Sequence, residues 1–339
     1  MNKAVFCLVS CLLVSTVHAQ TTPKVVFTGD NFTLAWQQTS QFTANKNWIG
    51  AGVSVGCCYG TGSGNVEADF QANVINQHPA FVHILTGGSD ISLVRDAIPY
   101  GVAWHQYEEA LVAMVGMAQK ANIKVILGNI PTVDTPPIGD DPQSVQLFNT
   151  WLANYGLTNN IPVVNYHDAL CQCVGSTSPN DTFAYSLSVQ PTTPNQLDSI
   201  ANDAGYALIT QMAQIAIQTY GLTIKSGYLS NVVTRYGLVN ADPPPSVLSQ
   251  VNNVVEGETV TFIPQANWSD GGVRPMLNQD FNGLKGTWTS SNPAVMYVNQ
   301  QGETFAYSAG TANISFRSAS GVYFSPWTMT VTEVYPPNI

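Results

Sequence analysis

The stretch from Lys24 to Thr33, KVVFTGDNFT, decides how the larger part of the chain is expected to fold. Its first five residues form a short β-branched, apolar run that ends at Gly29. Polar residues follow at once, with Asp30 and Asn31 directly after the glycine. In α/β proteins such residues stand where a parallel strand ends and a helix begins, and ligands bind at that edge. The stretch therefore predicts a buried strand with Asp30 and Asn31 at its carboxyl end.

Similar runs recur three times along the chain, and helical patterns lie between them. Continuous apolar runs of this length are typical of parallel strands that are covered on both faces. Between the runs, apolar residues recur at spacings of three and four, as on one face of a helix. Alternating strands and helices predict an α/β domain with a parallel sheet. The expected strands are 81–85, 124–127 and 162–164, and the expected helices are 104–118, 145–152 and 204–215.

The pattern changes after Tyr220. The Asp242–Pro245 segment, DPPP, is expected to be a stiff, extended linker. Short alternating runs bounded by Gly, Asn and Ser follow it, which is typical of a small all-β sandwich. These runs are 258–263, 286–290, 295–298, 304–308, 311–316 and 327–332.

The first 19 residues have the pattern of a secretory signal peptide. Lys3 gives a positive start, residues 4–17 are mostly apolar, and Val17-His18-Ala19 offers small residues to a signal peptidase. The apolar run is shorter than the ~20 residues that cross a bilayer. Lipoprotein cleavage before Cys11 is the alternative, although the apolar core ahead of it is short for that. We therefore expect an exported protein, extracellular or periplasmic, cleaved near Ala19.

The charge balance argues against nucleic acid and anionic membranes as partners. The whole chain carries 21 acidic and 11 basic residues. Cleavage after Ala19 would remove Lys3 and no acid, which leaves 10 bases and a net charge of −11. Proteins that bind nucleic acids or anionic membranes need basic patches on their surface. No later segment is long and apolar enough to span a membrane, so a soluble mature protein is expected. No cofactor or resident metal is expected.

Four cysteines remain after the expected signal peptide: Cys57, Cys58, Cys171 and Cys173. An even number in an exported chain predicts disulfides. Adjacent cysteines rarely pair, because the ring that they close is strained. We therefore expect two bonds that join the loop 50–59 to the loop 170–174, with the pairing left open. A metal site from the four thiols and His167 is the alternative.

Three further segments carry candidate site residues. The glycine-rich segment 50–56 is expected to be a loop whose backbone N–H groups could hold an anion. Gly87-Gly88-Ser89-Asp90 follows the expected strand 81–85 and faces the same edge of the sheet. The segment 203–206, DAGY, opens the last helix of the domain.

Together these segments resemble the sequence blocks of the SGNH (GDSL) hydrolases over about residues 24–220. Residues 29–31 match the Gly-Asp-Ser block with Asn31 at the place of the nucleophilic serine, Gly52 matches the glycine of the second block, and residues 87–90 match Gly-x-Asn-Asp. The resemblance implies a flavodoxin-like, three-layer α/β/α fold. It also implies an esterase-type site with oxyanion donors at Gly52 and Ser89.

The final block departs most from the family, where it reads Asp-x-x-His-Pro-Asn. Counting back from Gly205 places Leu197 and Ile200 at the aspartate and the histidine, and the alternative register places Gln190 and Thr193 there. Attack by serine requires a hydroxyl, a base and a group that orients the base. None of the three is found, so a serine-esterase mechanism is not expected.

Other residues are considered as replacements. His78 stands at the start of a strand, at the wrong edge; His83 is expected to be a structural histidine within a strand, and His105 is expected on the surface of a helix. Only His167 follows a strand at its carboxyl end, and a new pair of His167 with Ser54 is the alternative catalytic arrangement. Asn31 can also be interpreted as a helix N-cap, for which asparagine is well suited.

The segment after the linker resembles the bacterial immunoglobulin-like group 2 domain. The resemblance lies in residues 256–261 (EGETVT), 288–295 (WTSSNPAV) and 309–312 (AGTA). It implies a spacer or an adhesion module. The expected organisation is a signal peptide over 1–19, an SGNH-like domain over 20–222, a linker over 223–245 and an immunoglobulin-like domain over 246–335.

We expect a secreted, non-hydrolytic relative of SGNH esterases that binds an acylated or plain carbohydrate in the former active-site cleft. The expected cleft residues are Asp30, Asn31, Gly52, Gly88 and Ser89. The first alternative is an active ester hydrolase that uses other residues. The second is a structural surface or adhesion protein.

Overall fold

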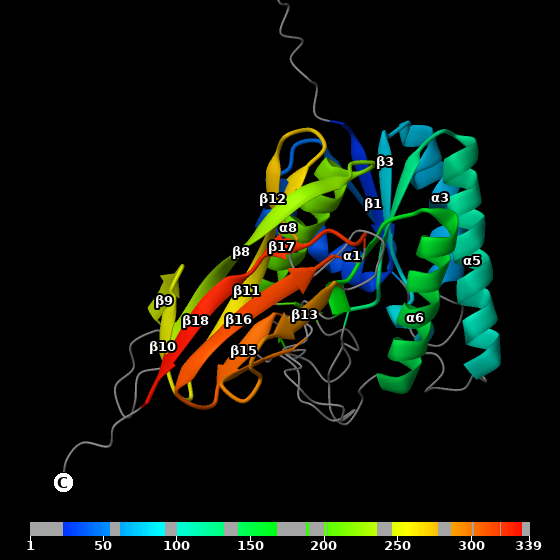
Figure 1. The fold of residues 1–339 in the computed structure, drawn as a ribbon. Helices are drawn as coiled ribbons and strands as arrows, with labels where there is room; N and C mark the ends of the chain where they lie inside the picture. The colour runs from blue at the N-terminus through cyan, green and yellow to red at the C-terminus, as the bar shows by residue number, and fades with distance from the viewer. Residues whose placement is uncertain are drawn as a thin grey trace, which may run out of the picture.

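The computed structural model describes an α/β part followed by a β-rich part (Figure 1). The described residues are 23–54, 62–91, 100–131, 142–167, 188–189, 200–201, 203–235, 246–276, 286–299, 302–318 and 320–333. Residues 1–22, which contain the expected signal peptide, lie outside them. Within the described helices, none is both long and apolar enough to cross a membrane.

A five-stranded parallel sheet forms the centre of the α/β part, in the order β2-β1-β3-β4-β5. Helices connect the strands along the chain, and each strand runs parallel to the neighbours with which it pairs. The expectation of an α/β domain with a parallel sheet is confirmed. The strands are β1 (Val25–Gly29), β2 (Trp48–Gly52), β3 (Phe81–Leu85), β4 (Lys124–Gly128) and β5 (Val163–Val164).

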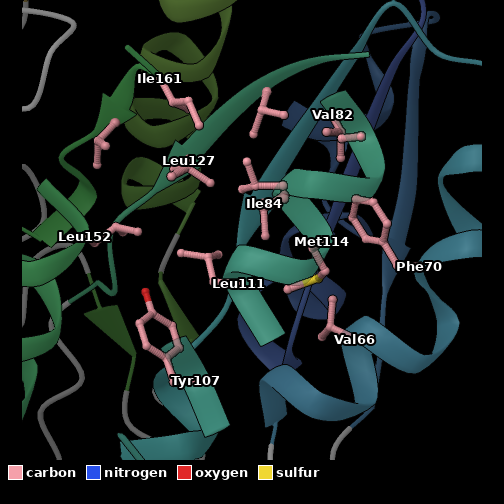
Figure 2. Close-up of a cluster of buried hydrophobic side chains, with 14 of the residues drawn as sticks. Val66, Phe70, Val82, Ile84, Tyr107, Leu111, Met114, Leu127, Leu152 and Ile161 are labelled. Carbon is pink, nitrogen blue, oxygen red and sulfur yellow. The ribbon is translucent and has the colours of Figure 1, made fainter. Parts of the chain in front are cut away.

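Helices cover both faces of this sheet and bury two separate cores. On one face, α3 (Gly62–Asn73), α5 (Tyr100–Lys120) and α6 (Pro142–Asn159) pack on aliphatic side chains of the strands (Figure 2). On the other face, α1 (Asn31–Trp36), α2 (Ser40–Thr43) and α8 (Asp203–Thr219) enclose an aromatic core around Phe27. The result is three layers, helices–sheet–helices. A short 3₁₀ turn, η1 (Ile75–Gln77), precedes β3.

The interpretation of residues 50–52 as part of a loop is wrong, because they lie in the edge strand β2. The reason is close packing. Helix α1 approaches so near that a Cβ at Gly52 would lie 2.4 Å from the backbone nitrogen of Leu34. The glycines that suggested a flexible loop therefore allow β2 and α1 to pack closely together.

The β-rich part consists of a seven-stranded sheet and a four-stranded sheet that share one hydrophobic core. All six runs expected to be strands are present, with small shifts at their ends. The strands are β8 (Ile224–Arg235), β9 (Ser246–Ser249), β10 (Asn253–Val255), β11 (Thr259–Trp268), β12 (Val273–Pro275), β13 (Thr287–Ser290), β14 (Met296–Val298), β15 (Glu303–Ala306), β16 (Gly310–Arg317), β17 (Phe324–Ser325) and β18 (Trp327–Thr332).

The segment 223–245, expected to be a linker, begins with the long strand β8, so that expectation is wrong over 224–235. β8 pairs with β11 along most of its length. Its alternating pattern is hidden in the sequence because two inward positions are not apolar. Gly227 lies under the Phe324 ring, where a Cβ would have no room. Asn231 is buried and exchanges two hydrogen bonds with the backbone of Val251, at 2.7 and 2.9 Å.

Candidate functional site

The Asp30 carboxylate connects the ends of β1 and β3. It is 3 % exposed, and one oxygen accepts a hydrogen bond from the backbone N–H of Phe32 at 3.2 Å. The other oxygen accepts from the N–H groups of Gly87 and Ser89, each at 3.2 Å. Three backbone donors thus converge on one carboxylate. The buried Asp30 carboxylate therefore fixes the position of the backbone at the candidate site.

Asn31 is the first residue of α1, directly after the strand that was expected to present it. It is half-buried at the carboxyl edge of the sheet. The N-cap is Asp30, which has extended backbone angles and accepts from Phe32. The interpretation of Asn31 as the cap is therefore wrong, because the helix begins one residue earlier than that interpretation requires.

Gly52, the expected oxyanion donor, already has a partner for its backbone N–H. That group donates to the Oε1 atom of Gln37 at 3.0 Å, so Gln37 ties the end of β2 to α1. At Ser89, where the expected oxyanion donor is the side-chain hydroxyl in place of the family's asparagine, the backbone N–H donates to Asp30. Both backbone donors are thus engaged in holding the fold. An oxyanion hole needs donors that point at the reacting atom, whereas these two N–H groups point at Gln37 and Asp30.

Asp90 is a second buried carboxyl group next to Asp30, and Ser63 is its partner. Its oxygens accept from the Ser63 hydroxyl at 2.7 Å and the Ser63 N–H at 3.0 Å. Burial, opposed by these hydrogen bonds and reinforced by the charge of Asp30, raises the pKa of Asp90 to about 7. Ser63 is fully buried and inaccessible to a substrate. Its role could not be predicted, because no recognisable sequence pattern surrounds it.

The Asp90 carboxyl group predicts a pH-dependent stability. Between about pH 4 and pH 7 the folded protein holds a proton that the unfolded chain has lost, because the pKa is raised from 3.8 to about 7. The free energy of unfolding should therefore fall as pH rises through this window, by up to about 1.4 kcal/mol per pH unit. Asp90→Asn should flatten this dependence in denaturant titrations. Asp69→Asn, an exposed substitution on α3, should keep the wild-type slope; an equal slope in both variants would contradict the assignment.

His167 lies after β5, where its backbone N–H is held by a pair of asparagines. Its N–H donates to Asn129 Oδ1 at 2.9 Å, and Asn129 Nδ2 donates to Asn165 Oδ1 at 2.7 Å. The pairing with Ser54 is not supported, because Ser54 follows β2 at the opposite edge of the sheet. Four strand spacings of about 4.8 Å separate the two edges by roughly 19 Å. A serine and its base must lie within hydrogen-bond distance.

The remaining histidines are structural or lie on the surface. His83 is fully buried in β3, where its Nε2 lies 2.9 Å from the Tyr166 hydroxyl. Desolvation lowers its pKa to about 3, which keeps it neutral. His105 is exposed on α5 beside Glu108, as expected. His78 is exposed at the turn before β3, at the amino edge of the sheet, and has a positive φ of 48°.

Several expectations fall outside the described residues: Leu197, Gln190, Thr193 and the four cysteines Cys57, Cys58, Cys171 and Cys173. Of the final block, Ile200 lies in β7 (Ile200–Ala201), which pairs with β6 (Ser188–Val189). Among the described side chains, no group of three His, Cys, Asp or Glu is arranged to hold a metal ion. The disulfides therefore stay a prediction.

No protein-family model and no curated protein matches the chain. Its structural neighbours are GDSL-type lipases and esterases. A GDSL-like lipase from Bacteroides thetaiotaomicron is 27 % identical and covers 58 % of this chain and 88 % of its own, with a TM-score of 0.46. A catalytic mutant of an acetylxylan esterase from Geobacillus stearothermophilus is 15 % identical over 57 % of this chain and 94 % of its own, with a TM-score of 0.43.

Proposed function

We propose that this chain is an exported, non-hydrolytic relative of the SGNH esterases that binds an acylated or plain carbohydrate at the carboxyl edge of its parallel sheet. One observation carries the proposal. Asn31, whose amide is no nucleophile at neutral pH, occupies the first position of α1, where the Gly-Asp-Ser resemblance would put the serine. The sheet order β2-β1-β3-β4-β5 supports the resemblance, because it is the flavodoxin-like order.

The surroundings of Asn31 also argue against hydrolysis by a neighbouring group. The Asp30 oxygens are occupied by three backbone N–H groups, so they are poorly placed to accept a proton from a nucleophile. Asp90 is fully buried. His167 follows β5, three strands away from the end of β1, or roughly 14 Å at a spacing of about 4.8 Å. Among the described residues, no hydroxyl, base and orienting group stand together at this edge.

The same contacts narrow the part of the edge that a ligand can reach. Asp30 is buried and Gly52 donates to Gln37, so these two support the site rather than face a ligand. Asn31, Gly88 and Ser89 are half-buried on adjacent strand ends. We assign ligand contact to these three, with the Asn31 amide as the polar side chain that meets sugar hydroxyl or acyl groups.

A ligand-induced stability shift tests this proposal. Acetylated xylo-oligosaccharides are the probe, and a bound ligand at one hundred times its Kd should stabilise the protein by about 2.7 kcal/mol. Asn31→Trp, which fills the site, should abolish the increase in Tm. Asn292→Trp, an exposed substitution in the β-rich part, should preserve it. A shift that survives Asn31→Trp, or no shift with acetylated and plain carbohydrates alike, would rule out this site.

For the β-rich part we propose a spacer or adhesion module of the immunoglobulin-like group 2 kind. Its own core of aromatic and aliphatic side chains, shared by both sheets, supports a unit that is stable by itself. The motif resemblance in residues 256–261 and 288–295 supports the family. A purely structural role for the whole chain would be favoured if the α/β part bound no ligand.

A further inference from the structure

A groove of about 570 Å³ lies at the opposite, amino edge of the parallel sheet, between the two parts of the chain. Its floor is formed by residues at the starts of β2, β3 and β4, including Trp48, Phe81 and Lys124. The last turns of α8 form one wall, and Asp270 and Arg274 of the β11–β12 hairpin form the other. The volume lies within the ~300–1,000 Å³ typical of ligand sites.

Side-chain amides dominate the polar lining of this groove. Gln214 on α8 donates one N–H to Asn45 Oδ1 at 2.7 Å, which positions its remaining polar atoms. Asn47 donates to the Pro23 carbonyl, and its Oδ1 has no hydrogen-bond partner among the described residues. The Gln218 side chain likewise makes no hydrogen bond within the described part of the chain. Paired donors and acceptors of this kind suit vicinal hydroxyl groups.

The groove is positively charged within a strongly acidic chain. Arg274 and Asp270 form a two-pronged ion pair, with N···O distances of 3.1 and 2.7 Å, and so neutralise each other. Lys124 lies 5.0 Å from the Phe81 ring and 5.5 Å from the Tyr220 ring, and no carboxylate of the described residues pairs with it. The net charge of the lining is thus +1, whereas the chain carries −10.

The wall contributed by the hairpin is held in place rather than free. Ser269 donates its N–H to the Thr223 carbonyl at 2.9 Å and accepts from the Thr223 N–H at 3.2 Å. The hairpin tip is therefore tied to the segment that follows α8. Asp270 also accepts from the Gly272 N–H at 2.9 Å, which closes the turn. A preformed site of this kind loses little free energy to ordering when a ligand binds.

From this charge and this lining we propose that the groove binds a short acidic oligosaccharide, with Lys124 donating to a sugar carboxylate and Asn47, Gln214 and Gln218 pairing with hydroxyl groups. The site is built from both parts of the chain and lies at the sheet edge opposite Asn31. It does not depend on the function proposed for that edge.

The test begins with the full-length mature chain on an array of neutral and uronic-acid-containing oligosaccharides. We expect acidic members to be retained, and the best of them is then titrated calorimetrically. Lys124→Gln should weaken its binding about tenfold or more, because a charge-assisted hydrogen bond is lost. Asp270→Asn keeps an acceptor for Gly272 but frees Arg274, so it should tighten binding about two- to fivefold. Weaker binding by Lys124→Gln together with tighter binding by Asp270→Asn is expected only for an acidic ligand.

Three control variants separate binding in the groove from misfolding and from binding at the opposite edge of the sheet. Lys120→Gln, on the last turn of α5 and outside the groove, should change Kd less than twofold. Lys124→Arg should restore most of the binding, which excludes misfolding as the cause of the loss. Asn31→Trp should leave the affinity unchanged. The proposal would be overturned if the protein retained only neutral glycans, carboxylate peptides instead of glycans, or no glycan at all. It would also be overturned if substitution of Lys124 left the affinity unchanged.

Discussion

Trp36→Ala is expected to lower the free energy of unfolding by about 3–5 kcal/mol, the range for removing a large buried aromatic side chain. Trp36 is fully buried at the end of α1. Its ring lies 5.2 Å from that of Phe27 and 5.7 Å from that of Phe42, both in edge-to-face geometry. Its indole N–H donates to the Thr210 hydroxyl on α8 at 2.9 Å. One side chain thus joins α1, α2, β1 and α8, and denaturant unfolding measures its contribution.

Two companion variants make that measurement specific. Thr210→Val keeps the shape but leaves the indole N–H without its partner, so a loss of about 1–3 kcal/mol is expected. Leu157→Ala, at a position that is 46 % exposed on α6, should change stability by less than about 0.5 kcal/mol. A Trp36→Ala cost as small as that of Leu157→Ala would contradict the central position assigned to this side chain.

The α/β part could be predicted well from the sequence because its strands are continuous apolar runs and its long helices are periodic. The runs at 81–85 and 124–127 correspond to β3 and β4 almost residue by residue. The misses have a common physical cause. β2 and β8 contain glycine and asparagine at positions where a pattern search expects apolar residues, because Gly52 contacts α1 and Gly227 lies under Phe324. A local sequence pattern does not reveal such long-range contacts.

The candidate site could be predicted only in part, for a related reason. The position of Asn31 at the strand–helix junction follows from one short stretch of sequence. The partners of Asp30 do not, since Gly87 and Ser89 lie 57 and 59 residues away along the chain. The engagement of Gly52 by Gln37 and the Asp90–Ser63 pair likewise depend on how α1 and α3 pack against the sheet. The separation of Ser54 from His167 is evident only from the strand order.

Asn31→Ser alone is expected to leave the protein without esterase activity. A serine hydroxyl is a poor nucleophile unless a base removes its proton. The nearby carboxylate, Asp30, is fully engaged with backbone N–H groups, and Ile200 of the final block is a strand residue. Loss of the nucleophile or the base of such a triad alone costs about 10⁶ in kcat. Enzyme-like turnover by Asn31→Ser would require a base near residue 31 and would contradict the placement of His167 three strands away.

The central claim is that the carboxyl edge of the sheet binds without hydrolysing, and the measurement that tests it most directly is fluorophosphonate labelling of the intact wild-type protein. Intact-mass analysis after labelling, run beside p-nitrophenyl acetate turnover, reports any activated serine. We predict no covalent adduct and no turnover above the buffer rate. Stoichiometric labelling of one serine, with matching turnover, would contradict the claim and identify the chain as a working esterase.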